Sequence, residues 1–252
     1  MIMLRFLSFF FILFALASCA KDSSGLSPGQ STGLGGSLAR FTIVGNFLYT
    51  VDNTTLHSFD ISDPAHPAQR HSIDVGQGVE TIFPLNGLLF LGTQSGMHIF
   101  QLLPDGTPKF LSRYDHIISC DPVVANAQYA YVTLRVSGCR QAVAGAADLL
   151  EIIDIANIQQ PAIVASYDLE SPYGLGLDGQ TLFVCLGAAG LKVFNASDPQ
   201  NLQQVAYLSD INAVDVIPID GLLLVVGPDS IQQYDYTDLG NIKKVSEIAI
   251  GA

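Results

Sequence analysis

The chain of 252 residues is 49% hydrophobic and only 13% charged, and its 23 acidic against 11 basic residues give a formal net charge of −12. With half of its residues apolar, the chain can bury a large core and is not a disordered segment. The acidic balance excludes a nucleic-acid-binding protein, because phosphate contacts need clustered lysine and arginine. No apolar run after residue 20 approaches the roughly 20 residues that span a bilayer.

The N-terminus predicts export. Arg5 precedes an almost purely apolar stretch over 6–17, which has the length of a secretory hydrophobic region and is too short to span a membrane. The stretch ends in Leu16-Ala17-Ser18-Cys19, which resembles the bacterial lipobox, where a cysteine after small residues is lipidated and becomes the mature N-terminus. We expect a signal peptide over 1–18 and a lipid on Cys19. An ordinary signal peptide with an incidental cysteine is the alternative.

Residues 19–37 are rich in serine and glycine and have no periodicity, so they predict a flexible tether between the lipidated cysteine and the folded domain. Acyl chains would hold the protein on a bacterial membrane, for which we expect the outer membrane, with the domain in the periplasm or outside the cell. This anchor is the only expected contact with the membrane.

The remainder of the chain is one unit repeated five times. Five similar apolar segments align at their fourth residues, which are Phe59, Phe100, Ile153, Phe194 and Tyr234. A period near 40 residues, with one insertion of about 12 residues in the third unit, is typical of a repeat architecture. Each unit shows four short strands separated by turns, and no stretch has helical periodicity. In the fourth unit these strands are expected over 174–177, 181–186, 191–195 and 203–208.

The units predict the blades of a five-bladed, all-β propeller with four antiparallel strands per blade. The first strands are apolar on both faces and the fourth strands are polar, as expected of sheets sandwiched radially with a protected outer edge. We favour a closed ring over a solenoid, because both terminal units lack polar caps. The domain covers 38–252, each blade being built from its own segment. The expected blades are about 38–76, 77–117, 118–170, 171–211 and 212–252.

Three segments carry a family resemblance: Tyr129-Ala130-Tyr131-Val132, Leu150-Glu151-Ile152-Ile153-Asp154-Ile155 and Leu191-Lys192-Val193-Phe194. They resemble the LVIVD repeat of bacterial β-propeller lipoproteins, and the resemblance covers about residues 38–250. It implies a propeller at the cell envelope, in a family without an established enzymatic activity. Tyr173 departs from the pattern, since related chains often carry histidine before a glycine at the start of the fourth blade.

The cysteines agree with export. Cys120 begins the third blade and Cys139 lies in its enlarged loop on the same face, so an oxidising compartment would let them form a disulfide that pins the insertion. Two free thiols are the alternative. Cys185 lies in an apolar strand and is expected to be an inert core residue.

Candidate ligand-binding residues converge on one opening of the ring. The aligned starts of the first strands are Arg40, Glu80, Asp121, Tyr173 and Asp215. Polar groups that converge in a concavity are the default binding-site hypothesis. Their three carboxylates could hold a cation or include an acid or base; the alternative is that they cap strand ends and balance Arg40. No metal-binding or catalytic motif has the required spacing, so we assign no catalytic residue, metal or cofactor.

Three functions remain open. We expect a non-enzymatic binding module that presents its mouth and third-blade insertion to a protein, glycan or small ligand. The alternatives are a carbohydrate-active enzyme with paired carboxylates at the mouth and a structural subunit of an envelope complex. We expect a monomer that binds no nucleic acid.

Overall fold

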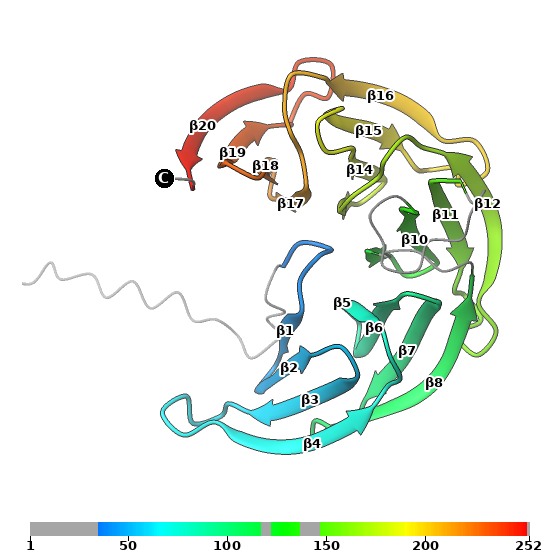
Figure 1. Cartoon of the computed structure of the whole chain (residues 1–252), viewed down its shortest axis with the longest axis vertical. Helices are drawn as coiled ribbons and strands as arrows, with labels where there is room; N and C mark the ends of the chain where they lie inside the picture. Colours follow the sequence, from blue (N-terminus) through cyan, green and yellow to red (C-terminus); the bar gives the residue numbers. More distant parts are fainter. Residues whose placement is uncertain (1–34, 117–121, 137–146, 251–252) are drawn as a thin grey trace, which may run out of the picture.

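The computed structural model describes residues 35–116, 122–136 and 147–250. Within these ranges the chain forms twenty β-strands in five four-stranded antiparallel sheets, and no helix is long and apolar enough to cross a membrane. The sheets are arranged as blades around a common centre (Figure 1). The predicted all-β propeller with five blades of four antiparallel strands is confirmed.

Every blade takes its strands from one continuous stretch of chain, in chain order. Blade 1 consists of β1 (Phe41–Val44), β2 (Phe47–Val51), β3 (Thr55–Asp60) and β4 (Ala68–Asp74). Blade 2 consists of β5 (Val79–Leu85), β6 (Leu88–Thr93), β7 (Gly96–Leu102) and β8 (Pro108–Asp115). Blade 3 consists of β9 (Val123–Ala125), β10 (Tyr129–Leu134), β11 (Leu149–Asp154) and β12 (Ala162–Asp168). Blade 4 consists of β13 (Leu175–Asp178), β14 (Thr181–Cys185), β15 (Leu191–Asn195) and β16 (Gln203–Leu208). Blade 5 consists of β17 (Asp215–Ile219), β18 (Leu222–Val226), β19 (Ser230–Asp235) and β20 (Lys243–Ala249).

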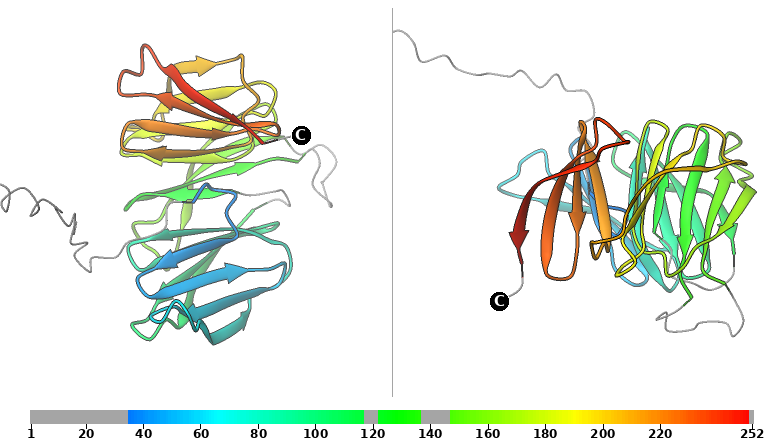
Figure 2. Two further views of the ribbon diagram at one scale, coloured as in Figure 1. Left: turned by 90° about the vertical axis from the view of Figure 1, so that its left-hand side faces the viewer. Right: turned by 90° about the horizontal axis from the view of Figure 1, so that it is seen from above.

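The strands run between the two faces of a disc (Figure 2), with the first strand of each blade near the centre and the fourth at the rim (Figure 1). Because neighbouring strands are antiparallel, the starts of the first strands and the loops between second and third strands share one face. We call this the mouth face. The tight turns between first and second strands lie on the opposite face. Two of them place an asparagine or aspartate and a glycine at positive φ, namely Asn86-Gly87 (48° and 76°) and Asp220-Gly221 (46° and 84°), as such hairpins require.

The aspartate of the repeat closes the loop between the third and fourth strands. In four blades the side chain that ends the third strand accepts a hydrogen bond from the backbone N–H two residues later, at 2.8–2.9 Å; these residues are Asp60, Asp154, Asn195 and Asp235. A second Asx turn follows three residues on, at Asp63, Asn157, Asp198 and Asp238. The short polar side chains thus replace backbone partners in the loop.

Four hydrophobic clusters hold the fold together, one at each junction between successive blades. An aromatic residue in the middle of the second strand lies in each cluster and is at most 1% exposed; the four are Tyr49, Phe90, Tyr131 and Phe183. A residue from the first strand of the following blade packs in the same cluster; these are Ile82, Val123, Leu175 and Val216. The sheets of blades 2, 3 and 4 are therefore apolar on both faces, because each has a neighbouring blade on each side.

The ring is open between blade 5 and blade 1, which corrects the expected closure. Phe41 occupies the position of the four first-strand residues above, all at most 2% exposed, yet Phe41 itself is 61% exposed. Leu224 occupies the position of the four buried aromatic residues and is only partly buried. A wide opening separates β17–β20 from β1–β4 in Figure 1, and the left view of Figure 2 looks into it. Closure failed as a prediction because apolar strands occur equally in closed and open arrangements.

The loop analysis predicts the effect of removing one Asx turn. Asp154→Ala should lower the free energy of unfolding by about 0.5–1.5 kcal/mol, the usual contribution of one hydrogen bond, because the N–H of Ala156 loses its acceptor. Asp154→Asn should be nearly neutral, since Asn195 fills the same role in blade 4. Urea titration followed by circular dichroism measures both, and equal losses in the two variants would contradict the assignment.

Candidate functional site

The structure describes four of the five predicted mouth residues. Arg40 immediately precedes β1 and is exposed, Glu80 is the second residue of β5, Tyr173 lies two residues before β13, and Asp215 begins β17. They lie on the mouth face, but no hydrogen bond or ion pair among the described residues joins any two of them. Asp121 lies outside the described residues, as do Cys19, Cys120 and Cys139, so the expected lipidation and disulfide remain predictions.

Asp215 binds the segment that precedes β1 rather than pointing freely into the opening. Its Oδ1 accepts a hydrogen bond from the Ser37 hydroxyl at 3.1 Å, and its Oδ2 accepts one from the N–H of Leu38 at 3.2 Å. Two glycines make this close approach possible. A Cβ on Gly36 would lie 2.0 Å from Oδ2, and one on Gly174 would lie 2.2 Å from Oδ1. The carboxylate is thus enclosed by chain from both sides.

Ser37 connects this segment to a second blade. Its hydroxyl oxygen also accepts a hydrogen bond from the N–H of Leu175 at 2.7 Å, and the residue is only 1% exposed. Residues 36–38, which we call the N-terminal clasp, therefore join blades 4 and 5 to the start of blade 1. The sequence analysis assigned Gly36 and Ser37 to the end of the flexible tether, because glycine and serine have no apolar side chain that would indicate packing.

Burial raises the pKa of Asp215, and its hydrogen bonds to the backbone of Val216 and Leu38 and to Ser37 oppose this shift only in part. The ionised carboxylate loses hydration in the folded state, and no cation pairs with it among the described residues. Asp215 therefore has a structural role, and desolvation makes its charge unfavourable for folding at neutral pH.

Tyr173 is also tied into the ring. Its N–H donates to the carbonyl of Cys185 at 2.8 Å, and its carbonyl accepts from the Thr133 hydroxyl of blade 3 at 2.6 Å. The guanidinium carbon of Arg135 lies 4.1 Å from the centroid of the Tyr173 ring, a cation–π contact across the junction between blades 3 and 4. Sequence reasoning missed Arg135, because the two residues are brought together only by the packing of neighbouring blades.

The base of the third-blade insertion lies beside this pair. The carboxylate of Asp148 accepts hydrogen bonds from the N–H of Val136 at 2.8 Å and of Ser171 at 3.0 Å. The Asp148 side chain thereby joins the end of the segment after β10 to the start of the segment before β11, and it also holds the connection between β12 and β13. The described residues on either side of the insertion, Val136 and Asp148, are therefore joined to each other on the mouth face.

Glu80 and Arg40 carry the remaining mouth charges. The Glu80 carboxylate accepts a hydrogen bond from the Gln94 amide at 3.2 Å, which holds it at the start of blade 2. Arg40 uses only its carbonyl in the sheet, accepting from the N–H of Val51 at 2.9 Å, while its side chain is exposed. Of the four predicted mouth residues that the structure describes, these two are the charged groups left available to a ligand.

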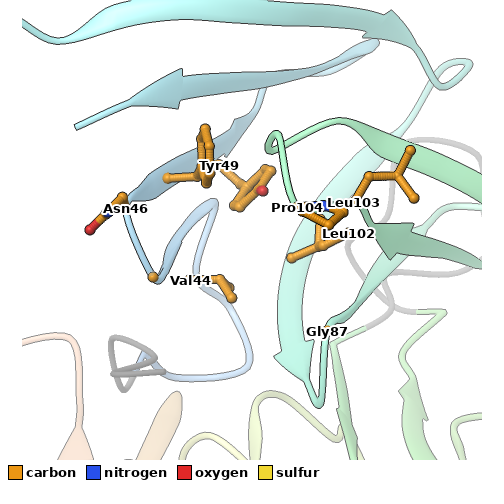
Figure 3. Close-up of a pocket in the computed structure, with 9 residues that line it drawn as sticks. Val44, Asn46, Tyr49, Gly87, Leu102, Leu103 and Pro104 are labelled. Carbon is orange, nitrogen blue, oxygen red and sulfur yellow. The ribbon is translucent and has the colours of Figure 1, made fainter. Parts of the chain in front are cut away.

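A pocket lies on the opposite face, between blades 1 and 2 (Figure 3). Its volume is about 400 Å³, and its lining combines the first turn of blade 1 with the loop before β8. The Tyr49 hydroxyl donates to the carbonyl of Gly106 at 3.2 Å, and burial together with Asp105 raises the pKa of Tyr49 to about 12, so the phenol stays neutral. The lining residues are Val44, Gly45, Asn46, Phe47, Tyr49, Gly87, Leu102, Leu103 and Pro104.

The histidines do not form a metal site in the part of the chain that the structure describes, where no group of three or more potential ligands is close enough. His57 instead links blade 1 internally. Its Nδ1 lies 3.1 Å from Ser72 Oγ and its Nε2 lies 3.4 Å from Asp52 Oδ2. Gln69 Nε2 also lies 3.3 Å from Nδ1. Burial lowers the pKa of His98, the equivalent residue of blade 2.

Comparisons with known proteins agree with this fold. Residues 35–75 match the family described as the LVIVD repeat. No curated protein sequence is significantly similar to the chain. Among solved structures, a protein from Lactobacillus plantarum matches with a TM-score of 0.63 at 12% identity, over 83% of this chain and 74% of that one.

Two further structures match at similar levels. The periplasmic gluconolactonase of Pseudomonas aeruginosa has a TM-score of 0.61 at 15% identity, over 82% of this chain and 68% of that one. The computationally designed protein Ika8 has a TM-score of 0.59 at 11% identity, over 82% of this chain, which spans only 60% of the designed one. At these identities the likeness is one of fold alone.

The buried carboxylate predicts a pH effect. Asp215→Asn keeps an acceptor for only one of the two donors, the Ser37 hydroxyl or the Leu38 N–H, which is a cost that does not vary with pH, and it cannot ionise. Because the folded-state pKa of Asp215 is raised, the wild type gains stability relative to this variant as the pH falls from 7 through that pKa, and loses it again as the pH rises. Chemical denaturation of both proteins between pH 4 and 7 should show this difference. A difference that is constant or of opposite sign would contradict the argument.

Proposed function

For a chain that carries an LVIVD repeat on a five-bladed β-propeller, we propose a non-enzymatic binding module, tethered by a lipid on Cys19 to a bacterial envelope membrane. The observation that carries this proposal is that the described mouth residues fall into two pairs with different contacts. Asp215 and Tyr173 hold the blades together, whereas Arg40 and Glu80 remain as charged groups on a rigid rim. Rigid, pre-organised polar groups favour recognition, because little conformational entropy is lost on binding.

The third-blade insertion supports the same face as the contact surface. Asp148 pins its base next to the cation–π pair of Arg135 and Tyr173. We include in the proposal a disulfide between Cys120 and Cys139, which would restrain the loop further and suit an oxidising compartment. A loop held by a rigid scaffold is a common site of recognition. The ligand class proposed is a protein, a glycan or a small molecule.

A carbohydrate-active enzyme receives less support from the geometry. Glycoside hydrolysis needs two carboxyl groups about 5–9.5 Å apart on either side of the scissile bond. The Asp215 carboxylate is engaged by the N-terminal clasp, which leaves Glu80 as the one available carboxylate among the predicted mouth residues that the structure describes. The similar fold of a gluconolactonase, at 15% identity, brings no activity to this chain.

The mouth can be tested by photo-crosslinking in intact bacteria. A benzophenone side chain at Ser95 of the full chain, an exposed residue in the loop between β6 and β7 on the mouth face, should give an adduct, because this position follows Gln94, the partner of Glu80, and leaves Glu80 in place. The matched control carries the same group at Asp220, an exposed turn residue on the opposite face. Adducts at both positions alike, or at Asp220 alone, would remove the mouth from the proposal.

The anchor is tested separately. Cys19→Ser should abolish incorporation of labelled palmitate and move the protein from the membrane fraction to the soluble fraction, since acyl chains supply the only proposed membrane contact. Cys185→Ser serves as the control, because this buried thiol lies in the core. Labelling that persists without Cys19 would show that the anchor is elsewhere.

A further inference from the structure

The pocket on the opposite face occurs at a junction where the repeat lacks one apolar residue. In blades 3, 4 and 5, the loop between the third and fourth strands carries Ile158, Pro199 and Leu239 at equivalent positions. Ile158 and Leu239 pack against the clusters that contain Phe90 and Phe183, and Pro199 is buried. These residues cover the junction with the preceding blade.

Blade 2 has Asp105 at this position, and its side chain is exposed. The loops are equally long, because equivalent residues pair across them, for example Gln101 with Lys109 and Asp154 with Ala162. A change of residue, and not a shorter loop, therefore leaves the junction between blades 1 and 2 without this cover. The pocket of about 400 Å³ lies at this junction (Figure 3).

The loop of blade 2 is fixed against blade 1. The Tyr49 hydroxyl donates to the carbonyl of Gly106 at 3.2 Å, and the Thr107 hydroxyl lies 2.9 Å from His71 Nε2. A Cβ on Gly106 would lie only 2.3 Å from the Phe47 ring, so the backbone of the loop approaches this ring closely. The pocket is thus formed before a ligand binds, which lowers the entropic cost of binding.

Apolar side chains form both walls of the pocket. They are Val44, Phe47 and Tyr49 from blade 1 and Leu102, Leu103 and Pro104 from blade 2. The centroids of the Phe47 and Tyr49 rings lie 6.4 Å apart, and such rings favour contacts with another aromatic ring. The Tyr49 oxygen donates its proton to Gly106 and can still accept a hydrogen bond.

The charge around the pocket disfavours an anion. None of the residues that line it is charged, and Asp105 lies close enough to contribute to the raised pKa of Tyr49. A carboxylate bound here would lose its hydration without gaining a cation among the lining residues.

We propose that this pocket binds a small uncharged molecule that has an aromatic body and one hydroxyl or ring N–H donor, which would reach the Tyr49 oxygen. Pockets of this size, lined mainly by apolar side chains with few polar groups, are typical of small-molecule sites. The site lies on the face opposite the mouth, so it is independent of the function proposed above.

The first test uses para-fluorobenzyl alcohol as the probe and para-fluorobenzoate as its anionic counterpart. Both are titrated with the full chain in detergent and followed by fluorine NMR, with detergent alone as the background. We expect saturable binding of the alcohol and binding of the benzoate that is about tenfold or more weaker. No saturable binding of the alcohol, or equal binding of the two probes, would overturn the proposal.

The second test fills the pocket. Asp105→Leu restores the residue type that blade 5 has at Leu239, and it should weaken binding of the alcohol by about tenfold or more. Asp105→Ala is the matched control, because it removes the same charge and the same acceptor for the Thr107 N–H but adds no bulk. This control should bind as the wild type does. Equal losses in the two variants would contradict the assignment.

The opposite wall provides an independent variant. Val44→Phe should cause the same loss as Asp105→Leu, whereas Val44→Ala should keep the binding. Affinities are compared among variants whose melting temperature matches that of the wild type. Unchanged binding in a filled variant that melts normally would place the probe elsewhere and overturn the proposal.

Discussion

The burial of apolar sheet faces between successive blades is the interaction on which the rest of the structure depends. Each junction encloses one aromatic residue from the earlier blade and one aliphatic residue from the later blade, and both are almost completely removed from water. Removing a Phe or Tyr side chain such as Phe183 from such a site ordinarily costs about 3–5 kcal/mol. Positions on the mouth face are fixed only because these junctions fix the angles between blades.

Polar contacts then fix the loops and the connections between the blades. Asx turns set the loops on one face, while Asp148, Asp215 and the Thr133 hydroxyl join separate segments on the other. These contacts are individually modest. They decide where charge is available, because a carboxylate that is engaged by backbone donors is no longer free for a ligand.

The sequence was sufficient to predict the number of blades, the strand order and the turns, because a period near 40 residues and alternating apolar strands report local structure. It was insufficient for closure of the ring, since Phe41 has the same apolar character as its buried counterparts and only its lack of a neighbour differs. It could not predict the contacts of Asp215, because its partners Ser37 and Leu38 are 178 and 177 positions away. The contact between Arg135 and Tyr173 could not be predicted either, because only the packing of neighbouring blades brings the two residues together.

The N-terminal clasp has a mechanical consequence. Any tension applied to the chain ahead of Gly36 reaches Asp215 and Leu175, in blades 5 and 4, before it reaches β1. The load is shared across three sheets, so it does not pull one edge strand off its sheet one hydrogen bond at a time. Hydrodynamic drag on a domain suspended from a surface would therefore be resisted by the fold at its centre, where several bonds must break together.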